Sequence, residues 1–241
     1  MISQTKGIVI KTISYGETGL VVKIFTEQLG MQSFMVKGIG GKRSKNKSAF
    51  FQPLNLLDLV VYHKENQGLH HIKEVQPDYI YQHLHSDVIK RSLLVFVNEL
   101  LFKSLHEEMP NMALFHWLHH ALVWLDLADQ HVADFHLIVM MELTKYLGFY
   151  PKRELAHTYT VFDMEEGLFG NRIPSHPYYV TGETVMQLIR LMEVSFDQNN
   201  HYSFTNAQRR DLLETLIVFY KLHLPAFSGF KSLEVLKMVL E

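Results

Sequence analysis

The residues with the clearest chemical bias in this chain of 241 residues are the cations between positions 37 and 47. The stretch VKGIGGKRSKNKSAFFQP also holds three glycines and no acidic residue. Cationic side chains neutralise phosphates and release counterions, and glycine lets a backbone approach closely. We therefore expect a nucleic-acid contact, and a solvated loop without a partner is the competing interpretation. The candidate DNA-binding residues are Lys37, Lys42, Arg43, Lys45 and Lys47.

Three phenylalanines lie beside this basic stretch. Phe34 alternates with its neighbours in a way that favours the core, whereas the pair Phe50–Phe51 suits either a loop anchor or a stacking surface for bases. Nothing in the chain resembles a helix that reads base edges, so binding should be largely indifferent to nucleotide sequence.

Fifteen histidines raise the alternative of a metal-dependent hydrolase. His116 and His120 are four residues apart on a predicted helix that also carries His119, and this spacing places two imidazoles on one face. However, no glutamate lies between them as in a zincin motif, and leucine and tryptophan surround them. We expect structural or exposed histidines there, and neither a metal nor another cofactor.

Motifs for other catalytic chemistry are missing from the sequence. It has no cysteine, which excludes disulfides, thiol catalysis and thiolate metal sites. It has no Walker loop, dinucleotide fingerprint or nucleophile elbow, and Gly38–Arg43 lacks the spacing of a phosphate-binding loop. The sequence therefore favours a protein that is not an enzyme.

Charge is distributed unevenly along the chain. Residues 1–80 carry ten Lys and Arg against six Asp and Glu, and residues 81–241 carry thirteen against nineteen. The start alternates and contains lysine, unlike a secretory signal, and no window reaches the roughly 18 apolar residues of a membrane span. We expect a cytoplasmic, nucleoid-associated protein without a membrane partner.

Two periodicities predict an α+β protein with two domains. Short runs with turn signals between them predict five strands in residues 1–80, and a five-stranded OB-type β-barrel is a closed solution of that size. The basic loop then connects the third and fourth strands. The predicted strands cover residues 6–13, 20–27, 31–38, 54–63 and 68–75.

From about residue 84 the period becomes helical, which predicts an all-α bundle of about six helices over residues 81–241. Ser86 and Asn111 are expected N-caps, Gly148 a helix end, and Thr205 with Gln208 a capping box. A last helix is predicted from Ser232. Residues 149–181 contain three prolines and two glycines and predict an irregular or hairpin-like insert.

Both ends of the chain resemble the RecO family of bacterial recombination mediators. The first eighty residues carry G-I-V-I…Y-G-E-T…L-V-V-K-I-F-T-E-Q-L-G…V-K-G-I-G-G-K-R-S-K…Q-P-L, and Tyr220–Leu236 carries Y-K-L-H-L-P-A-F-S-G-F-K-S-L-E-V-L. The middle helices match mainly in pattern. The resemblance implies an OB domain followed by a helical domain, with the basic loop at the positions named above.

The resemblance also implies a function in recombinational repair. Family members bind single- and double-stranded DNA, anneal complementary strands, and with RecR help load RecA onto DNA coated with single-strand-binding protein. Their helical domain docks the acidic tail of that coating protein. Lys145 or Arg209 is a candidate cation for this tail. The alternative is an adaptor whose helical domain docks acidic tails while the chain binds no DNA directly.

One departure from the family concerns the insert. Many relatives hold a four-cysteine zinc site about where residues 149–181 fall, and this chain has no cysteine. His157 and His176 are the only histidines there, and two neutral ligands make a poor closed site. We expect a hairpin or loop without metal, held by four aromatic residues: Phe162, Phe169, Tyr178 and Tyr179.

Overall fold

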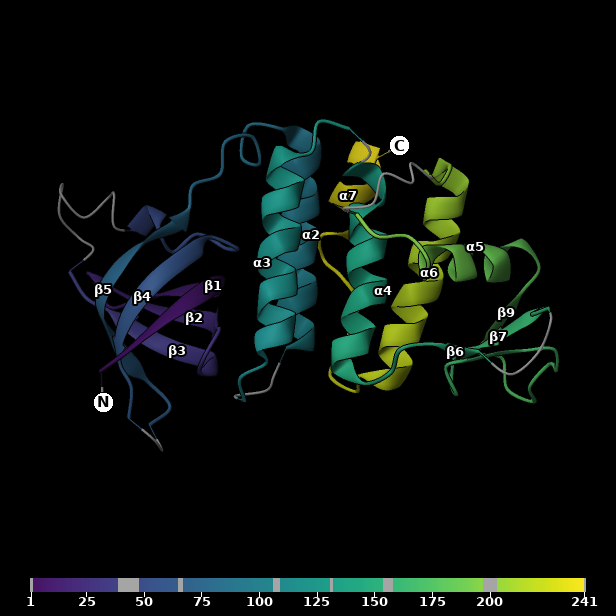
Figure 1. Cartoon of the computed structure of the whole chain (residues 1–241), viewed down its shortest axis with the longest axis horizontal. Helices are drawn as coiled ribbons and strands as arrows, with labels where there is room; N and C mark the ends of the chain where they lie inside the picture. Colours follow the sequence, from purple (N-terminus) through teal and green to yellow (C-terminus); the bar gives the residue numbers. More distant parts are fainter. Residues whose placement is uncertain are drawn as a thin grey trace. The chain divides into compact units, whose positions relative to one another are not determined.

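The computed structural model describes residues 2–38, 48–64, 67–105, 109–130, 132–153, 158–196 and 203–240 (Figure 1). The chain divides into two compact units, each described by itself. The first, the barrel unit, comprises Met1–Ser86 and Leu105–Leu127; the second, the helical unit, comprises Asp87–Ser104 and Ala128–Glu241. Along these described ranges, no helix combines the length and the apolarity that crossing a membrane requires.

The barrel unit contains a closed five-stranded barrel in the order β1-β2-β3-β5-β4, which confirms the expected fold. The long first strand closes it, because residues 7–15 of β1 pair with β2 and residues 2–8 pair with β4. A register shift between Val9 and Lys11 bends β1 between its two partners. The strands are β1 (Ile2–Tyr15), β2 (Gly19–Thr26), β3 (Gly30–Val36), β4 (Leu56–Tyr62) and β5 (His70–Tyr79).

The hairpin between β2 and β3 shows how the chain encodes its turns. Gly30 has a φ of 69°, a conformation that glycine adopts without strain. The Thr26 hydroxyl donates to the Gly30 carbonyl at 2.8 Å and accepts from the Leu29 N–H at 3.1 Å. These two bonds fix the register of β2 against β3.

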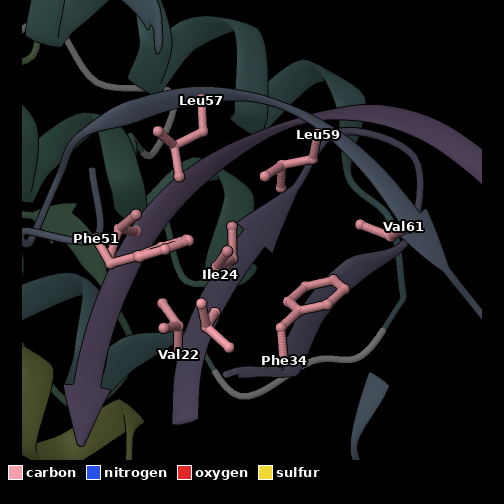
Figure 2. Close-up of a cluster of buried hydrophobic side chains, with 9 residues drawn as sticks. Val22, Ile24, Phe34, Phe51, Leu57, Leu59 and Val61 are labelled. Carbon is pink, nitrogen blue, oxygen red and sulfur yellow. The ribbon is translucent and has the colours of Figure 1, made fainter. Parts of the chain in front are cut away.

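The barrel core consists of buried side chains from β1, β2, β3 and β4, together with Phe51 (Figure 2). Phe34 is fully buried, as its alternation predicts, and Phe51 is 1% exposed while Phe50 packs at the margin. The pair therefore anchors the end of the basic loop. The buried residues are Val9, Val22, Ile24, Phe34, Val36, Phe51, Leu57, Leu59 and Val61.

Helix α3 (Met112–Leu127) belongs to the barrel unit. Asn111 caps its first turn by accepting from the Leu114 N–H at 3.0 Å, as expected. Phe115 lies 6.0 Å from Phe25 of the barrel, measured between ring centroids. At the other end of the helix, the fully buried Asp126 carboxylate accepts three backbone N–H groups, from residues 82–84, and the Tyr79 hydroxyl.

The helical unit is built from α2 (Val88–Ser104), α4 (Phe135–Leu147), α5 (Glu183–Leu191), α6 (Asn206–His223) and α7 (Leu233–Leu240). Gly148 ends α4 in the left-handed conformation, and Thr205 with Gln208 forms the expected capping box of α6. The cap of α2 was predicted wrongly: Asp87, not Ser86, accepts the Lys90 N–H at 3.0 Å, while the Ser86 hydroxyl turns back to the His83 carbonyl.

The insert is more regular than expected. Its strands β6 (Lys152–Arg153), β7 (Val161–Asp163), β8 (Leu168–Gly170) and β9 (Tyr179–Thr181) form a small sheet in the order β6-β8-β7-β9. Phe162 and Phe169 are buried and stack 4.5 Å apart, as predicted, whereas Tyr178 is 42% exposed and contributes little to this core. The strands have only two or three residues, so their periodicity was too short to recognise in the sequence.

Candidate nucleic-acid interface

The predicted DNA-binding residues begin where β3 ends. Lys37 follows Val36 directly and is exposed. The other four, Lys42, Arg43, Lys45 and Lys47, lie outside the described residues. Their placement therefore stays a prediction, and the geometry of the barrel around the two ends of this loop carries the argument.

The returning end of the basic loop is fixed to the barrel. The Thr12 hydroxyl donates to the Phe51 carbonyl at 2.6 Å, and the Asn55 amide donates to the Ala49 carbonyl at 2.9 Å. Leu54 has a φ of 61°, rare for a branched residue, and its N–H donates to the Val9 carbonyl at 2.6 Å. The returning end of the loop therefore has a defined place on the barrel.

Two further cations lie on the outer face of the barrel, and the sequence argument missed them. Lys11 of β1 and Lys23 of β2 are directly opposite each other, and Lys23 also faces Ser33 of β3. The alternation of β1 and β2 places both lysines outward, but only the register shows that they are neighbours.

Exposed apolar and aromatic side chains accompany these cations. Ile13 and Tyr15 follow Lys11 on β1 and are 52% and 62% exposed. Surface rings stack on unpaired bases, and such stacking does not depend on base identity. This face therefore combines cations with one exposed ring, that of Tyr15.

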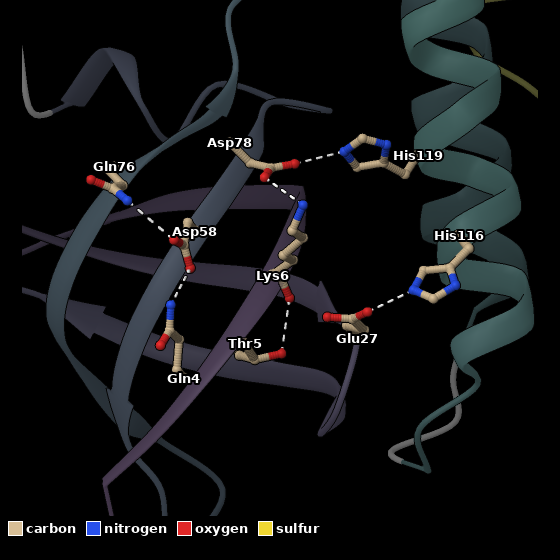
Figure 3. A network of polar contacts seen from close by, with 9 residues as sticks. All are labelled: Gln4, Thr5, Lys6, Glu27, Asp58, Gln76, Asp78, His116 and His119. Atoms are coloured by element: carbon tan, nitrogen blue, oxygen red, sulfur yellow. Dashed lines mark hydrogen bonds and ion pairs between the residues drawn. The ribbon is translucent and has the colours of Figure 1, made fainter.

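A separate polar network shows that other charged groups of the barrel unit have structural partners (Figure 3). Lys6 contacts Asp78 at 2.6 Å, and His119 of α3 contacts the other Asp78 oxygen at 2.6 Å. Burial alone would raise the pKa of the Asp78 carboxyl, yet the hydrogen bonds from Lys6 and His119 lower it below its ordinary value. The hydrogen bond to Asp78 raises the pKa of Lys6.

The same network accounts for the histidine cluster of α3. His116 contacts Glu27 at 2.6 Å, so His116 and His119 contact different carboxylates of the barrel. Within the described ranges, no group of three or more histidine, aspartate or glutamate side chains is arranged to hold a metal ion. The two histidines connect α3 to the barrel.

The helical unit carries a shallow groove with a mixed lining. Leu213 of α6 and Leu236 and Leu240 of α7 form its apolar part, and Arg210 and Lys237 add positive charge. Its cavity volume is about 30 Å³, close to the volume of one water molecule in the liquid.

Of the two cations expected near a tail-docking groove, Arg209 lines this one and Lys145 does not. Arg209 contacts Asp134 at 3.1 Å and donates to the Phe204 carbonyl and the Asn206 side chain. Lys145 instead bonds Glu142 at 2.6 Å and lies over the Tyr150 ring. Arg209 therefore shapes the groove, and Arg210 and Lys237 provide the charge at its rim.

In the insert, His176 contacts carboxylates by hydrogen bonding rather than joining a ligand cluster. The Tyr178 N–H donates to its Nδ1 at 3.2 Å, so Nε2 carries a proton and faces Asp163 at 3.3 Å and Glu165 at 3.5 Å. His157, the other histidine of the insert, lies outside the described residues. Stacked phenylalanines and the hydrogen bond between His176 and Asp163 hold the small sheet.

Comparison with known proteins matches nearly the whole chain. The family model "Recombination protein O N terminal" matches residues 1–81, and "Recombination protein O C terminal" matches residues 85–234. A "DNA repair protein RecO" of Flavobacterium psychrophilum is 42% identical over 239 residues, which cover 98% of each chain. Proteins of the same name from Flavobacterium johnsoniae and Phocaeicola vulgatus are 37% and 32% identical, again over 98% of each chain.

Proposed function

The chain belongs to the RecO family of DNA repair proteins, and from that premise we propose that its barrel binds single- and double-stranded DNA and promotes annealing of complementary strands. Binding is electrostatic and independent of nucleotide sequence, and no catalytic step is involved. Residues 1–80 form the DNA-binding domain, and residues 81–241 form the domain that contacts other proteins in the cytoplasm.

The observation that carries the proposal is the cationic outer face of the barrel. Lys11 of β1 lies opposite Lys23 of β2, and Lys37 directly follows the next strand, β3, where the basic loop begins. Cations beside an exposed ring on the outer face of a small barrel match the way that OB-folds hold single strands.

The experiment is a salt titration of DNA binding. Replacing Lys42, Arg43, Lys45 and Lys47 together by alanine should weaken binding to all sequences alike. It should also reduce the slope of log affinity against log salt by roughly 0.7 to 0.9 per lost contact. Annealing of complementary oligonucleotides should slow in parallel. An unchanged salt slope would remove the loop from the proposed interface.

For the helical domain we propose a partner that presents an acidic, partly apolar chain end, such as the tail of a single-strand-binding protein. The groove beside Arg210 and Lys237 supplies complementary charge and a small apolar surface. Through such contacts, and together with RecR, the protein would help RecA replace the single-strand-binding protein on DNA. Replacing Arg210 and Lys237 by glutamate should weaken binding of a synthetic acidic tail peptide and leave DNA affinity unchanged.

The adaptor function is the second candidate, favoured by the groove alone. It requires the acidic peptide to bind while the whole protein shows no measurable affinity for any DNA. A wild-type salt titration without detectable DNA binding, together with tail binding that depends on Arg210, would replace the first proposal by this one.

A further inference from the structure

The barrel closes through a very short ladder between β3 and β5. Among the described residues these parallel strands share two residue pairs, Phe34 with His70 and Met35 with His71. Beyond them a crevice of about 230 Å³ opens between the strands. It lies where β3 passes into the basic loop. Its described lining consists of Met35, Val36, Lys37, His71, Ile72, Lys73 and Val75.

A β-bulge in β5 sets the direction of the side chains along one wall of this crevice. Val60 of β4 pairs with Glu74, and Val61 pairs with Ile72, so Lys73 is the extra residue of β5. As a result Ile72 and Val75 both pack against the barrel core, and Lys73 and Glu74 are both exposed. Bulges re-aim side chains in this way at the rims of barrels.

The charge of the crevice is positive. Lys37 lines it from the position after β3 and Lys73 from β5, and none of the described residues that line it is acidic. Glu74 is not among the lining residues, but its carboxylate lies 3.2 Å from the Lys73 ammonium group, and both side chains are largely exposed. An exposed ion pair of this kind is weak, so an anion between the two lysines can compete with Glu74. The edge of a sheet is itself a favourable place for an anion.

An aromatic ring lies beside this charge. Tyr62 of β4 is directly opposite His71 in the β4–β5 ladder, so the two side chains share the outer face of the barrel. The Tyr62 side chain is 48% exposed. A ring in this position can stack on a base only if that base is unpaired, because bases of a duplex are already stacked on each other.

We propose that the β3–β5 crevice binds one unpaired nucleotide of a single DNA strand, with its phosphate between Lys37 and Lys73 and its base on the ring of Tyr62. The crevice is below the range of roughly 300 to 1,000 Å³ that is usual for whole small-molecule ligands, and a volume of about 230 Å³ suits a single phosphate and sugar. This inference rests on the proposed function and adds a preference for single strands at one defined subsite.

The first test compares a labelled oligothymidylate of about 16 nucleotides with a duplex of equal length, by fluorescence anisotropy. Tyr62→Ala should weaken binding of the single strand about tenfold and change duplex binding less than about twofold, since stacking contributes only for unpaired bases. Tyr62→Phe should keep the wild-type affinity. Equal losses for both DNAs, or no loss for either, would overturn the proposal.

The second test concerns the phosphate. Lys37→Ala with Lys73→Ala should weaken single-strand binding about tenfold or more and reduce the salt slope by roughly 1.4, which corresponds to two lost contacts. The control, Lys152→Ala with Arg172→Ala, removes two exposed cations from the insert and should leave the slope unchanged. Glu74→Gln should strengthen single-strand binding about twofold, because it removes the competitor of the phosphate. Equal effects of the two double variants would contradict the site.

A third measurement reports occupancy directly. The chain has no cysteine, so His71→Cys introduces a unique thiol into the crevice lining. Bound oligothymidylate should slow alkylation of this thiol several-fold. An acidic peptide at the same concentration of charges should not slow it. Protection by the peptide and not by the oligonucleotide would mean that the crevice binds a protein rather than DNA. If the wild type binds no DNA, the proposed function fails. If the wild type binds DNA and the thiol stays unprotected, only the present inference fails.

Discussion

The barrel unit and the helical unit hold distant segments together by different means. In the barrel, ladder hydrogen bonds join all five strands, so the backbone itself connects residues as far apart as Ile2 and Tyr62. A helix satisfies its backbone internally and has no such bonds to offer its neighbours. Between the helices of the helical unit, side chains therefore make the connections that join distant segments.

Three anchors of the helical unit illustrate this. Glu99 of α2 accepts from the Lys231 and Ser232 N–H groups at 2.8 Å, Asp134 accepts from the Phe204 N–H at 3.0 Å, and the buried Tyr220 hydroxyl donates to the Met140 carbonyl at 2.7 Å. Each joins segments that are at least 70 residues apart in the chain. We therefore expect the barrel unit to depend most on its apolar core and the helical unit to depend on single polar side chains.

The largest effect is expected from Phe51→Ala, which empties the centre of the barrel core. The loss of a fully buried phenylalanine should lower the free energy of unfolding by about 3 to 5 kcal/mol. Both tryptophans lie in α3, so urea denaturation followed by tryptophan fluorescence reports on the barrel unit. Replacing the half-buried Phe50 by alanine should lower the free energy of unfolding clearly less. Equal losses for the two variants would contradict the description of Phe51 as the anchor.

The next largest effect is expected from Asp126→Asn. This variant sharpens the comparison of the two units, because the Asp126 carboxylate is a polar side-chain anchor in the barrel unit, which otherwise depends on its apolar core. An amide cannot accept all the hydrogen bonds that now converge on it, so about 3 kcal/mol should be lost. The same tryptophan signal measures the change. Glu17→Gln, at an exposed position of the same unit, serves as control and should stay within about 0.5 kcal/mol of the wild type.

A smaller effect, dependent on pH, is expected from Glu99→Gln in the helical unit. Burial alone would raise the pKa of Glu99, but hydrogen bonds from Lys103 and from residues 231 and 232 lower it to about 2, from 4.5. The ionised anchor therefore stabilises the fold above about pH 4.5, and this contribution is lost as the pH falls towards about 2.

Near neutral pH, Glu99→Gln should cost about 2 kcal/mol, measured by urea denaturation with far-UV circular dichroism. The difference between variant and wild type should shrink as the pH is lowered through the same window. A difference that stays constant with pH would show that the charge of Glu99 does not contribute to the anchor.

The smallest effect is expected from Thr205→Ala, which removes the N-cap of α6. Loss of the side-chain acceptor for the Gln208 N–H should cost about 1 kcal/mol. Thr205→Ser keeps the hydroxyl and should be nearly neutral in the same denaturation experiment. If Thr205→Ala cost as much as Glu99→Gln, local capping would matter as much in this unit as anchors between segments.

Much of the fold could be predicted because the relevant signals are local. Alternation within β1 and β2, the glycine that ends α4 and the capping box of α6 each act within a few residues. The short insert strands escaped prediction because they have too few residues to show a period. The Asp87 cap was missed because Ser86 and Asp87 are adjacent and both suit an N-cap.

The sequence by itself determined where strands and helices form, which end of the chain is basic, and to which family the protein belongs. The tertiary structure decided which lysines become neighbours on the barrel, which carboxylates His116 and His119 meet, and where Lys73 bulges beside Lys37. The physical reason is that periodicity acts over a few neighbouring residues, whereas strand register and side-chain pairing join positions that are tens of residues apart and exist only in the folded chain.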